Sequence, residues 1–323
     1  MTAMAYFMFS LALVPAPIAA EYWVREMIVI KRSIAKQYAG QEKIIIASGS
    51  GALFGIDSVQ AGRILKMPVI NFGLHAGLPL KTILSEAENA SEAGDMVILP
   101  LESHYYCDEE ITDWQIRNAI AWGYEQWHDM PLVDRLRAIS IMGPVFPVEL
   151  ALAKLLETLS PRIIGERLLA MDDARILAKY SRSPEPMSFA YSAYHVDALG
   201  NMRKTEGSKY MGMPRAADED IEICAKSWGR LGLFVDAMKH KGVKVFFANP
   251  PYVETENLDA GKIRAAADRF NRRLSRLAPV LDSKEHLVFP RSYFLNTELH
   301  LNAAGRAVRT QMLVDALLQV IRR

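Results

Sequence analysis

The chain has 323 residues, half of them hydrophobic, which is enough for one large or two ordinary domains with a substantial core. Its 38 basic and 37 acidic side chains nearly cancel, which excludes the basic surface typical of nucleic-acid-binding proteins. The two cysteines, Cys107 and Cys224, are too far apart in sequence for a metal-ligand motif. They leave two alternatives, one long-range disulfide in an oxidising compartment or two free buried thiols.

The N-terminal 20 residues carry no charged side chain. The apolar stretch 3–20 is close to the minimum of about 17 residues for a membrane-spanning helix. Three interpretations stay open: a cleaved signal sequence, an uncleaved anchor with Tyr22 and Trp23 at the membrane interface, or a buried helix. We predict a signal or membrane anchor over 1–20 and a connecting helix over 21–42.

An alternation of strands and helices follows. Short apolar, β-branched runs predict strands at 43–48, 68–72, 95–100 and 243–248. Helical patterns occupy 58–65, 80–90, 218–241, 260–277 and 303–321. This alternation indicates a parallel sheet with right-handed crossovers. The proline-containing segment 114–216 lacks the strand pattern, and we predict a largely helical insertion there.

The turn after the first strand is rich in glycine, and ligands of open α/β sheets bind where strands end. Gly49, Gly51 and Gly55 form a relaxed dinucleotide-binding pattern, but the second strand ends at Gly73 without the acidic residue that would hold a ribose. A phosphate loop is excluded, because no Gly-Lys-Ser/Thr sequence follows.

A nucleophile turn is the third interpretation of this segment. Ser50 lies between two glycines, and its own amide and that of Gly51 would lie at the start of a helix, where positive partial charge collects. The structural alternative is a tight strand-to-helix turn in which the serine only caps the helix.

A serine nucleophile needs a base, and two histidines compete for that role. His300 directly precedes the last predicted helix, which Asn302 could cap. His75 follows the second strand. For either residue the alternative is a hydrogen-bonded structural histidine.

Four segments in this order resemble the SGNH/GDSL hydrolase superfamily: I-A-S-G-S-G-A-L-F-G-I-D-S, N-F-G-L-H-A-G-L-P-L, G-D-M-V-I-L-P-L-E and N-T-E-L-H-L-N-A-A-G. More narrowly, they look like its bacterial cell-surface branch, which includes the alginate acetylation proteins and the esterase-like protein of teichoic-acid D-alanylation. The similarity covers 43–102 and the C-terminal third, about half of the chain.

The resemblance implies a three-layer α/β/α sandwich of flavodoxin-like SGNH type over 43–323. It implies Ser50 as nucleophile and His300 as base, and it adds the amide of Gly73 to those of Ser50 and Gly51 as the oxyanion hole. Such amides stabilise the charge that develops on the carbonyl oxygen. No metal or cofactor is implied.

The chain departs from the family pattern at two places. The aspartate expected three or four residues before the histidine is replaced by Thr297 or Asn296, and we expect Asn296 to orient the imidazole ring. The asparagine expected after the third strand is absent, and Glu102 lies there instead. We expect Glu102, Glu298 and His75 to line the site; a capping or surface ion-pair role is the alternative for Glu102.

The function that the resemblance implies is O-acyl transfer to, or deacylation of, an exported cell-surface polysaccharide through an acyl-enzyme. It also implies a periplasmic location, tethered to the inner membrane or exported, and a membrane acyltransferase or polysaccharide-export partner. By the positive-inside rule, the basic residues after the apolar stretch would instead leave the body in the cytoplasm. Two other classes stay open: an inactive polysaccharide-binding or assembly subunit, and a nucleotide-binding oxidoreductase.

Overall fold

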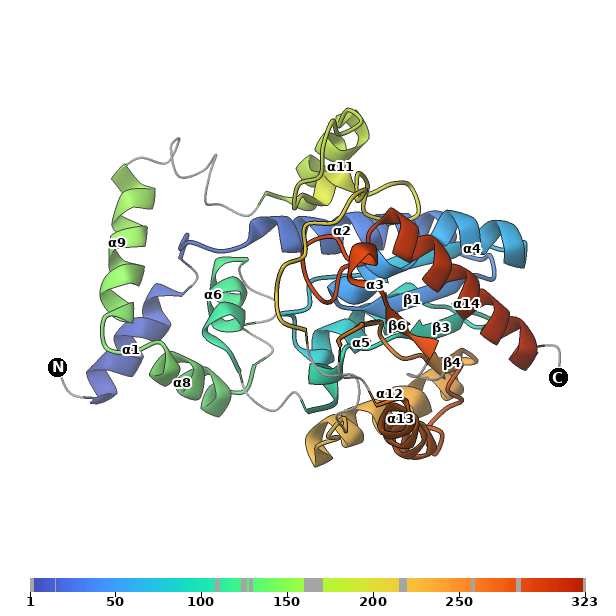
Figure 1. The fold of residues 1–323 in the computed structure, drawn as a ribbon. Helices are drawn as coiled ribbons and strands as arrows, with labels where there is room; N and C mark the ends of the chain where they lie inside the picture. The colour runs from blue at the N-terminus through green and yellow to red at the C-terminus, as the bar shows by residue number, and fades with distance from the viewer. Residues whose placement is uncertain are drawn as a thin grey trace. The chain divides into compact units, whose positions relative to one another are not determined.

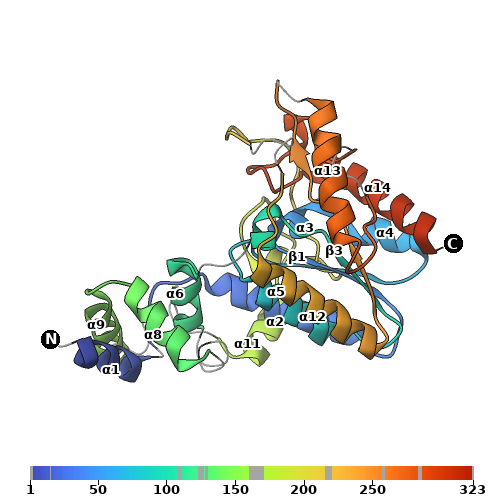
Figure 2. The ribbon, with the colours of Figure 1, turned by 90° about the horizontal axis from the view of Figure 1, so that it is seen from below.

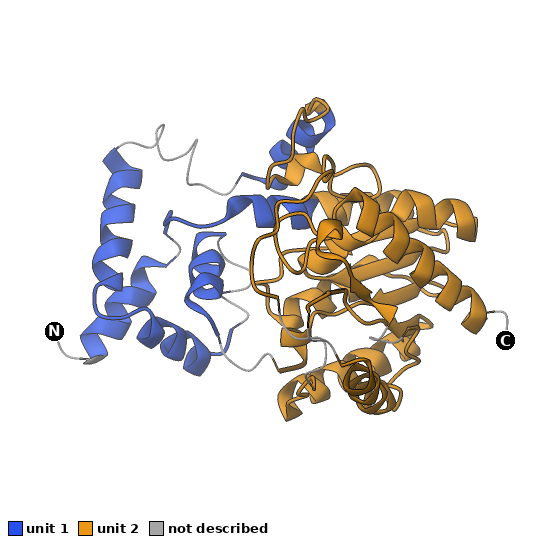
Figure 3. Cartoon of the chain, in the orientation of Figure 1, with its two compact units in different colours: residues 1–29, 110–181 blue, residues 30–109, 182–323 orange. Residues whose placement is uncertain are grey.

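A computed structural model describes residues 3–14, 16–107, 111–122, 127, 130–159, 171–214, 220–256, 259–282 and 286–321. The chain forms two compact units (Figure 3). Unit 1 consists of residues 1–29 and 110–181, and unit 2 consists of residues 30–109 and 182–323.

Unit 2 is built on a four-stranded parallel sheet (Figure 1). Its strands are β1 (Ile44–Ser48), β2 (Val69–Gly73), β3 (Met96–Leu99) and β4 (Lys244–Phe247), in the order β2-β1-β3-β4. A separate parallel pair joins β5 (Tyr252–Val253) to β6 (Val288–Phe289). The predicted α/β class with a parallel sheet is confirmed. Because β1 lies between β2 and β3, the loops after these three strands meet at one edge of the sheet.

Helices cover both faces of this sheet, as a three-layer sandwich requires (Figure 2). On one face, α3 (Ser50–Gly55), α4 (Ser58–Leu65) and α14 (Ala303–Ile321) pack their apolar residues against Ile44, Ile46 and Ile98. On the other face lie α5 (Leu80–Ala90) and α12 (Ala225–Lys241). A further helix, α13 (Ala260–Leu274), follows β5.

Most predicted elements lie where the pattern placed them, and α4, α5 and α14 match to the residue. Three helix boundaries were wrong, one of them that of the connecting helix predicted to 42, which ends at Gln37. The helix predicted from 218 begins at Ala225, because Cys224 has extended backbone as its N-cap. The helix predicted to 277 ends at Leu274. Gly242 caps α12 with a φ of 79°, a left-handed conformation that favours glycine.

The insertion is helical but is not a single block. Its described helices are α6 (Asp113–Ala121), α8 (Leu132–Ile141), α9 (Phe146–Leu159) and α11 (Asp173–Arg182), and no strand occurs among the residues described between 114 and 214. The unit boundaries differ from the predicted ones. Residues 110–181 join the N-terminal segment in unit 1, whereas 182–216 belong to unit 2. The reason is an apolar cluster that α1 (Ala3–Leu13) shares with α8 and α9.

The N-terminal apolar stretch is not one continuous helix. Helix α1 ends at Leu13, and the predicted connecting helix is α2 (Tyr22–Gln37), which crosses from unit 1 into unit 2. Among the described residues, no single helix is long and apolar enough to cross a membrane. Helices α8 and α9 meet that test only together, with a bend of 96° between them.

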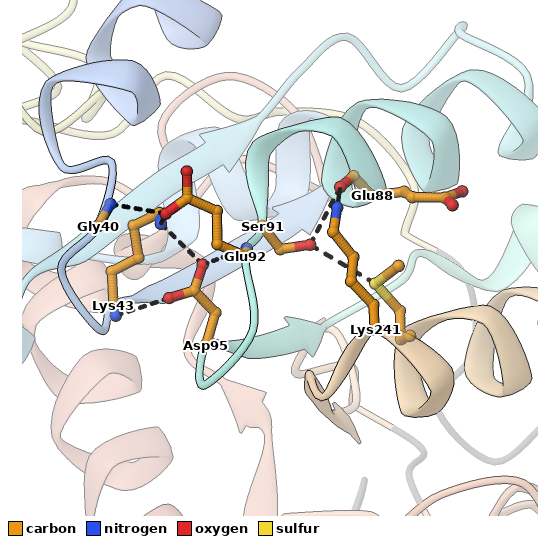
Figure 4. Close-up of polar contacts among 8 residues, drawn as sticks. Gly40, Lys43, Glu88, Ser91, Glu92, Asp95 and Lys241 are labelled. Carbon is orange, nitrogen blue, oxygen red and sulfur yellow. Dashed lines mark hydrogen bonds and ion pairs between the residues drawn. The ribbon is translucent and has the colours of Figure 1, made fainter.

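A buried ion pair lies at the amino end of the sheet (Figure 4). Lys43 Nζ is 2.7 Å from Asp95 Oδ2, and Asp95 Oδ1 accepts from the Lys43 amide at 3.0 Å. Glu92 approaches the same ammonium group at 3.7 Å and accepts from the Gly40 amide. These contacts tie β1 to β3 at the end where the strands begin, opposite the edge at which a site is expected.

A disulfide joins Cys107 and Cys224, whose Cα atoms are 4.8 Å apart. Of the two alternatives for the cysteines, the structure therefore holds the disulfide. It ties the 3-10 helix η1 (Ser103–Cys107), which follows β3, to the start of α12.

Candidate active site

Helix α3 begins at Ser50, directly after the glycine that follows β1. A Cβ on Gly73, at the end of β2, would lie only 2.2 Å from the Leu53 nitrogen. Glycine is therefore required there, because α3 packs directly on the end of β2. Ser50 is buried, with 6% of its surface exposed.

A short, closed loop presents His300. The Leu295 amide donates to the His300 carbonyl at 2.8 Å, and Phe294 forms an antiparallel bridge with Leu301. Asn302 caps α14, as predicted, because its Oδ1 accepts from the Gly305 amide at 3.0 Å. Because the loop is closed in this way, the side chain of Asn296, four residues before His300, can reach the His300 ring.

The His300 ring stacks on Phe54, with ring centroids 4.0 Å apart and planes 17° apart. Phe54 lies four residues after Ser50 on α3, so both side chains leave the same side of that helix. The structure thus brings His300 against the helix that begins with Ser50. The hydrogen bonds of His300 run to other residues, and none among the described residues joins it to Ser50.

Asn296 contacts the His300 ring and links it to Tyr191. Its Nδ2 donates to the Tyr191 hydroxyl at 2.8 Å, and its Oδ1 lies 2.9 Å from His300 Nδ1. The amide oxygen can only accept, so this network assigns the ring proton to Nδ1. The other ring nitrogen, Nε2, is then unprotonated, which is the form that a general base requires.

Burial lowers the pKa of His300 to about 3, and the nearby His75 ring adds to the effect. The imidazole is therefore neutral at physiological pH. Asn296 carries no charge, so it cannot balance the imidazolium that would form after proton transfer. Thr297 does not contact the ring; its hydroxyl accepts from the Leu299 amide.

Glu102 is fully buried and binds the Ser50 turn itself. Its Oε1 accepts from the Gly51 amide at 2.7 Å, and its Oε2 accepts from the Ser48 hydroxyl at 2.6 Å and the Gly49 amide at 3.2 Å. A Cβ on Gly49 would lie 2.7 Å from this carboxylate and collide with it, and a Cβ on Gly51 would make a tight contact at 3.0 Å. Glu102 therefore holds the turn in place, and the surface role is wrong.

The predicted oxyanion hole needs correction for two of its three amides. The Gly51 amide donates to Glu102, and the Gly73 amide donates to Asn71 Oδ1 at 2.9 Å. Neither amide is available to a substrate oxygen in this structure. In the described part of the chain, the Ser50 amide has no hydrogen-bond partner, so it is the one predicted donor that stays available.

A small cavity of about 80 Å³ opens beside this turn. Its wall contains Glu102 and Glu298, together with residues after β3 and β4 such as His104, Pro250 and Tyr252. Ser50, His300 and His75 are not among the described residues that line it. His75 lies on the loop after β2, where its Nδ1 accepts from the Gly77 amide at 3.0 Å.

Some residues of the site had no signal in the sequence. Tyr191 lies 109 residues from His300, within the insertion, and nothing marked it in advance. Asn71 was recognisable only as a polar residue in an apolar strand. Its Nδ2 donates to the Ala52 and Ile56 carbonyls at 2.9 and 3.0 Å, which fixes α3 against β2.

No protein-family model, no curated protein and no solved structure matches this chain significantly.

Proposed function

We propose that this protein is a serine-dependent esterase or O-acyltransferase of the SGNH type that acts on an exported cell-surface polysaccharide. The observation that carries the proposal is the neutral His300 ring, oriented by Asn296 and stacked on the helix that begins with Ser50. Nucleophilic catalysis requires a neutral, oriented imidazole within hydrogen-bond reach of the serine, and the stacking of His300 on Phe54 brings the ring to the helix that carries Ser50.

In the first step, Ser50 Oγ would attack the carbonyl carbon of an ester while His300 Nε2 takes the hydroxyl proton. The Ser50 amide would donate to the developing oxyanion. The protonated His300 would then give its proton to the departing alcohol, which leaves an acyl group on Ser50. Attack by water on that acyl-enzyme makes the protein an esterase, and attack by a sugar hydroxyl makes it a transferase.

The disulfide supports the location that the proposal needs. Disulfides form and persist in oxidising compartments such as the bacterial periplasm. A polysaccharide on the cell surface, and a membrane acyltransferase or export partner, would be encountered there.

The Glu102 contacts favour a second candidate function, a non-catalytic polysaccharide-binding or assembly subunit. The Glu102 carboxylate occupies the Gly51 amide, and the cavity lies beside Glu102 and not at Ser50. A glycan could bind there through hydroxyl contacts without any reaction at the serine.

Covalent labelling separates the two candidates. A fluorophosphonate reacts with activated serines whatever their natural substrate, so the enzyme should gain one adduct, which peptide mass spectrometry should locate on Ser50. Ser50→Ala and His300→Gln should abolish the adduct. Ser58→Ala is the matched control, because Ser58 is also buried and its hydroxyl has no hydrogen-bond partner among the described residues. If the folded wild-type protein gains no adduct on Ser50, the result favours the second candidate, the non-catalytic binding function.

A further inference from the structure

Helix α9 of unit 1 exposes apolar residues along one side. Its apolar stripe, defined as Val148, Leu152, Leu155, Leu156 and Leu159, is 44% to 68% exposed. The spacing of these residues places them on one face of the helix. The apolar face of a helix in a water-soluble protein normally packs against the core. In α9, Phe146, Leu150 and Ala153 already fill that role, so the stripe is a second apolar face that points outward.

The charged residues of α9 do not interrupt this stripe. Glu149 pairs with Arg117 of α6 at 2.6 Å, and Lys154 pairs with Glu157 of its own helix at 3.2 Å. All three α9 side chains are partly covered, whereas the leucines beside them are exposed. Their charges are thus neutralised within unit 1.

Two neighbouring helices extend the apolar surface. Helix α1 has no charged residue, exposes Met4, Met8 and Phe9, and lies beside α9 (Figures 1 and 2). The Tyr6 hydroxyl lies within hydrogen-bond distance of the Ile139 and Gly143 carbonyls, at 3.0 and 2.7 Å, and so holds α1 against α8 and the turn after it. Helix α8 and the turn after it add further exposed residues: Leu132, Val133, Ile141 and Val145.

We propose that unit 1 enters the hydrocarbon of a lipid bilayer through α1, α8 and α9, without a helix that spans it. The α9 stripe consists of leucines and one valine, whereas protein interfaces are enriched in aromatic residues, Met and Arg; α8 also exposes Arg137 beside its apolar residues. Helix α1 is too short to cross about 30 Å of hydrocarbon, and α8 and α9 reach a spanning length only as a bent pair. This inference is independent of the acyl-transfer proposal, and it assigns a role to helices α8 and α9 of the insertion.

Two tryptophans of unit 1 have the kind of polar partner that suits the border of such a membrane. Trp23 Nε1 donates to Glu21 Oε2 at 2.8 Å, and Trp114 Nε1 donates to Glu21 Oε1 at 3.3 Å. Trp122 packs edge-on against Trp114. Tryptophans with a polar partner concentrate where hydrocarbon meets water.

A fluorescent label on the stripe tests the proposal. Both native cysteines form the disulfide, so an introduced cysteine is the only free thiol of the full chain. Leu155→Cys places a nitrobenzoxadiazole label on the stripe, and Leu233→Cys, on α12 and 74% exposed, is the matched control in unit 2. With vesicles of phosphatidylcholine and phosphatidylglycerol, the label at 155 should brighten at least twofold and be quenched by doxyl-labelled lipid, while the label at 233 changes little.

Two results would overturn the proposal. If the protein binds vesicles while the label at 155 stays in water, the stripe does not enter the lipid and α1 alone makes the contact. If the label at 155 is already shielded without vesicles, and Leu155→Glu converts a dimer into a monomer, a second copy of the chain covers the stripe. Leu152→Cys repeats the measurement one helical turn away, in case the first label disturbs folding.

Discussion

Replacing Glu102 with glutamine tests how the Ser50 turn works. Glutamine keeps the size of the side chain and an oxygen that can accept from the Gly51 amide. Its Nε2 can donate to the Ser48 hydroxyl, which is free to donate to the Pro100 carbonyl at 2.9 Å. Only the Gly49 amide loses its acceptor. One lost hydrogen bond to a charged group costs about 1.5–3 kcal/mol, so we expect Tm to fall by several degrees with the fold intact.

The same change should accelerate ester cleavage. A unit charge about 4 Å from a developing oxyanion, at an effective dielectric constant of about 20, opposes it by about 4 kcal/mol. The full removal of that term would raise the rate by about 10²–10³. Because the glutamine oxygen still occupies the Gly51 amide, we expect a smaller gain, of at least about tenfold.

The assay is the hydrolysis of 4-nitrophenyl acetate, with the rate of the Ser50→Ala protein subtracted. Glu298→Gln is the matched control, since it removes a carboxylate from the same cavity wall without touching the Ser50 turn, and it should change the rate less than twofold. A folded Glu102→Gln protein with an unchanged or lower Ser50-dependent rate would show that this carboxylate does not oppose the oxyanion. The rate gain expected from the contact between Glu102 and the Gly51 amide would then be refuted.

Two further changes probe the base and the sheet. Asn296→Asp places a carboxylate 2.9 Å from His300 Nδ1, so the pKa of His300 should rise from about 3 and the Ser50-dependent rate at pH 7 should increase at least about tenfold. The wild-type rate should stay flat down to about pH 4, while the variant loses activity at a higher pH; coinciding pH profiles would refute this role of Asn296. Because the folded pKa of His300 lies below its unfolded value of about 6.5, its contribution to stability is complete above pH 6.5 and is lost as the pH falls toward 3. Asp95→Asn leaves the buried Lys43 ammonium without its closest partner, so the free energy of unfolding measured in urea should fall by about 3–5 kcal/mol. Asp220→Asn is the control, because the pair of Asp220 with Arg269 is exposed, and it should cost less than about 1 kcal/mol. Equal losses for the two variants would contradict the role given to burial.

The elements that could be predicted are those whose information is local. A run such as Ile44–Ser48 is apolar on both faces, which is the pattern of a buried parallel strand whatever surrounds it. The link between Asn296 and His300 was also predictable, because four residues in a tight loop keep the two side chains within reach.

The rest of the site depends on pairings across long stretches of chain. Glu102 lies 54 residues from Ser48 and reaches it only because β1 and β3 are neighbours in the sheet. The sequence predicted a parallel sheet, but it did not show whether the Glu102 carboxylate would face the turn or the solvent. Unit 1 was missed for a similar reason, since Tyr6 meets its partners 133 and 137 residues away.

The proposed bilayer contact also removes a conflict in the sequence. The positive-inside rule concerns segments that cross the membrane, and it assigned the chain after the apolar stretch to the cytoplasm because Arg25, Lys31 and Arg32 follow that stretch. A helical unit that enters the bilayer without crossing it leaves both of its ends on the same side, so these residues carry no information about which side that is. Two of them also have structural tasks: Lys31 is buried and donates to the Asn71 and Gly200 carbonyls, and Arg32 pairs with Glu86. The disulfide then becomes the feature that favours one side of the membrane, and it favours the oxidising one.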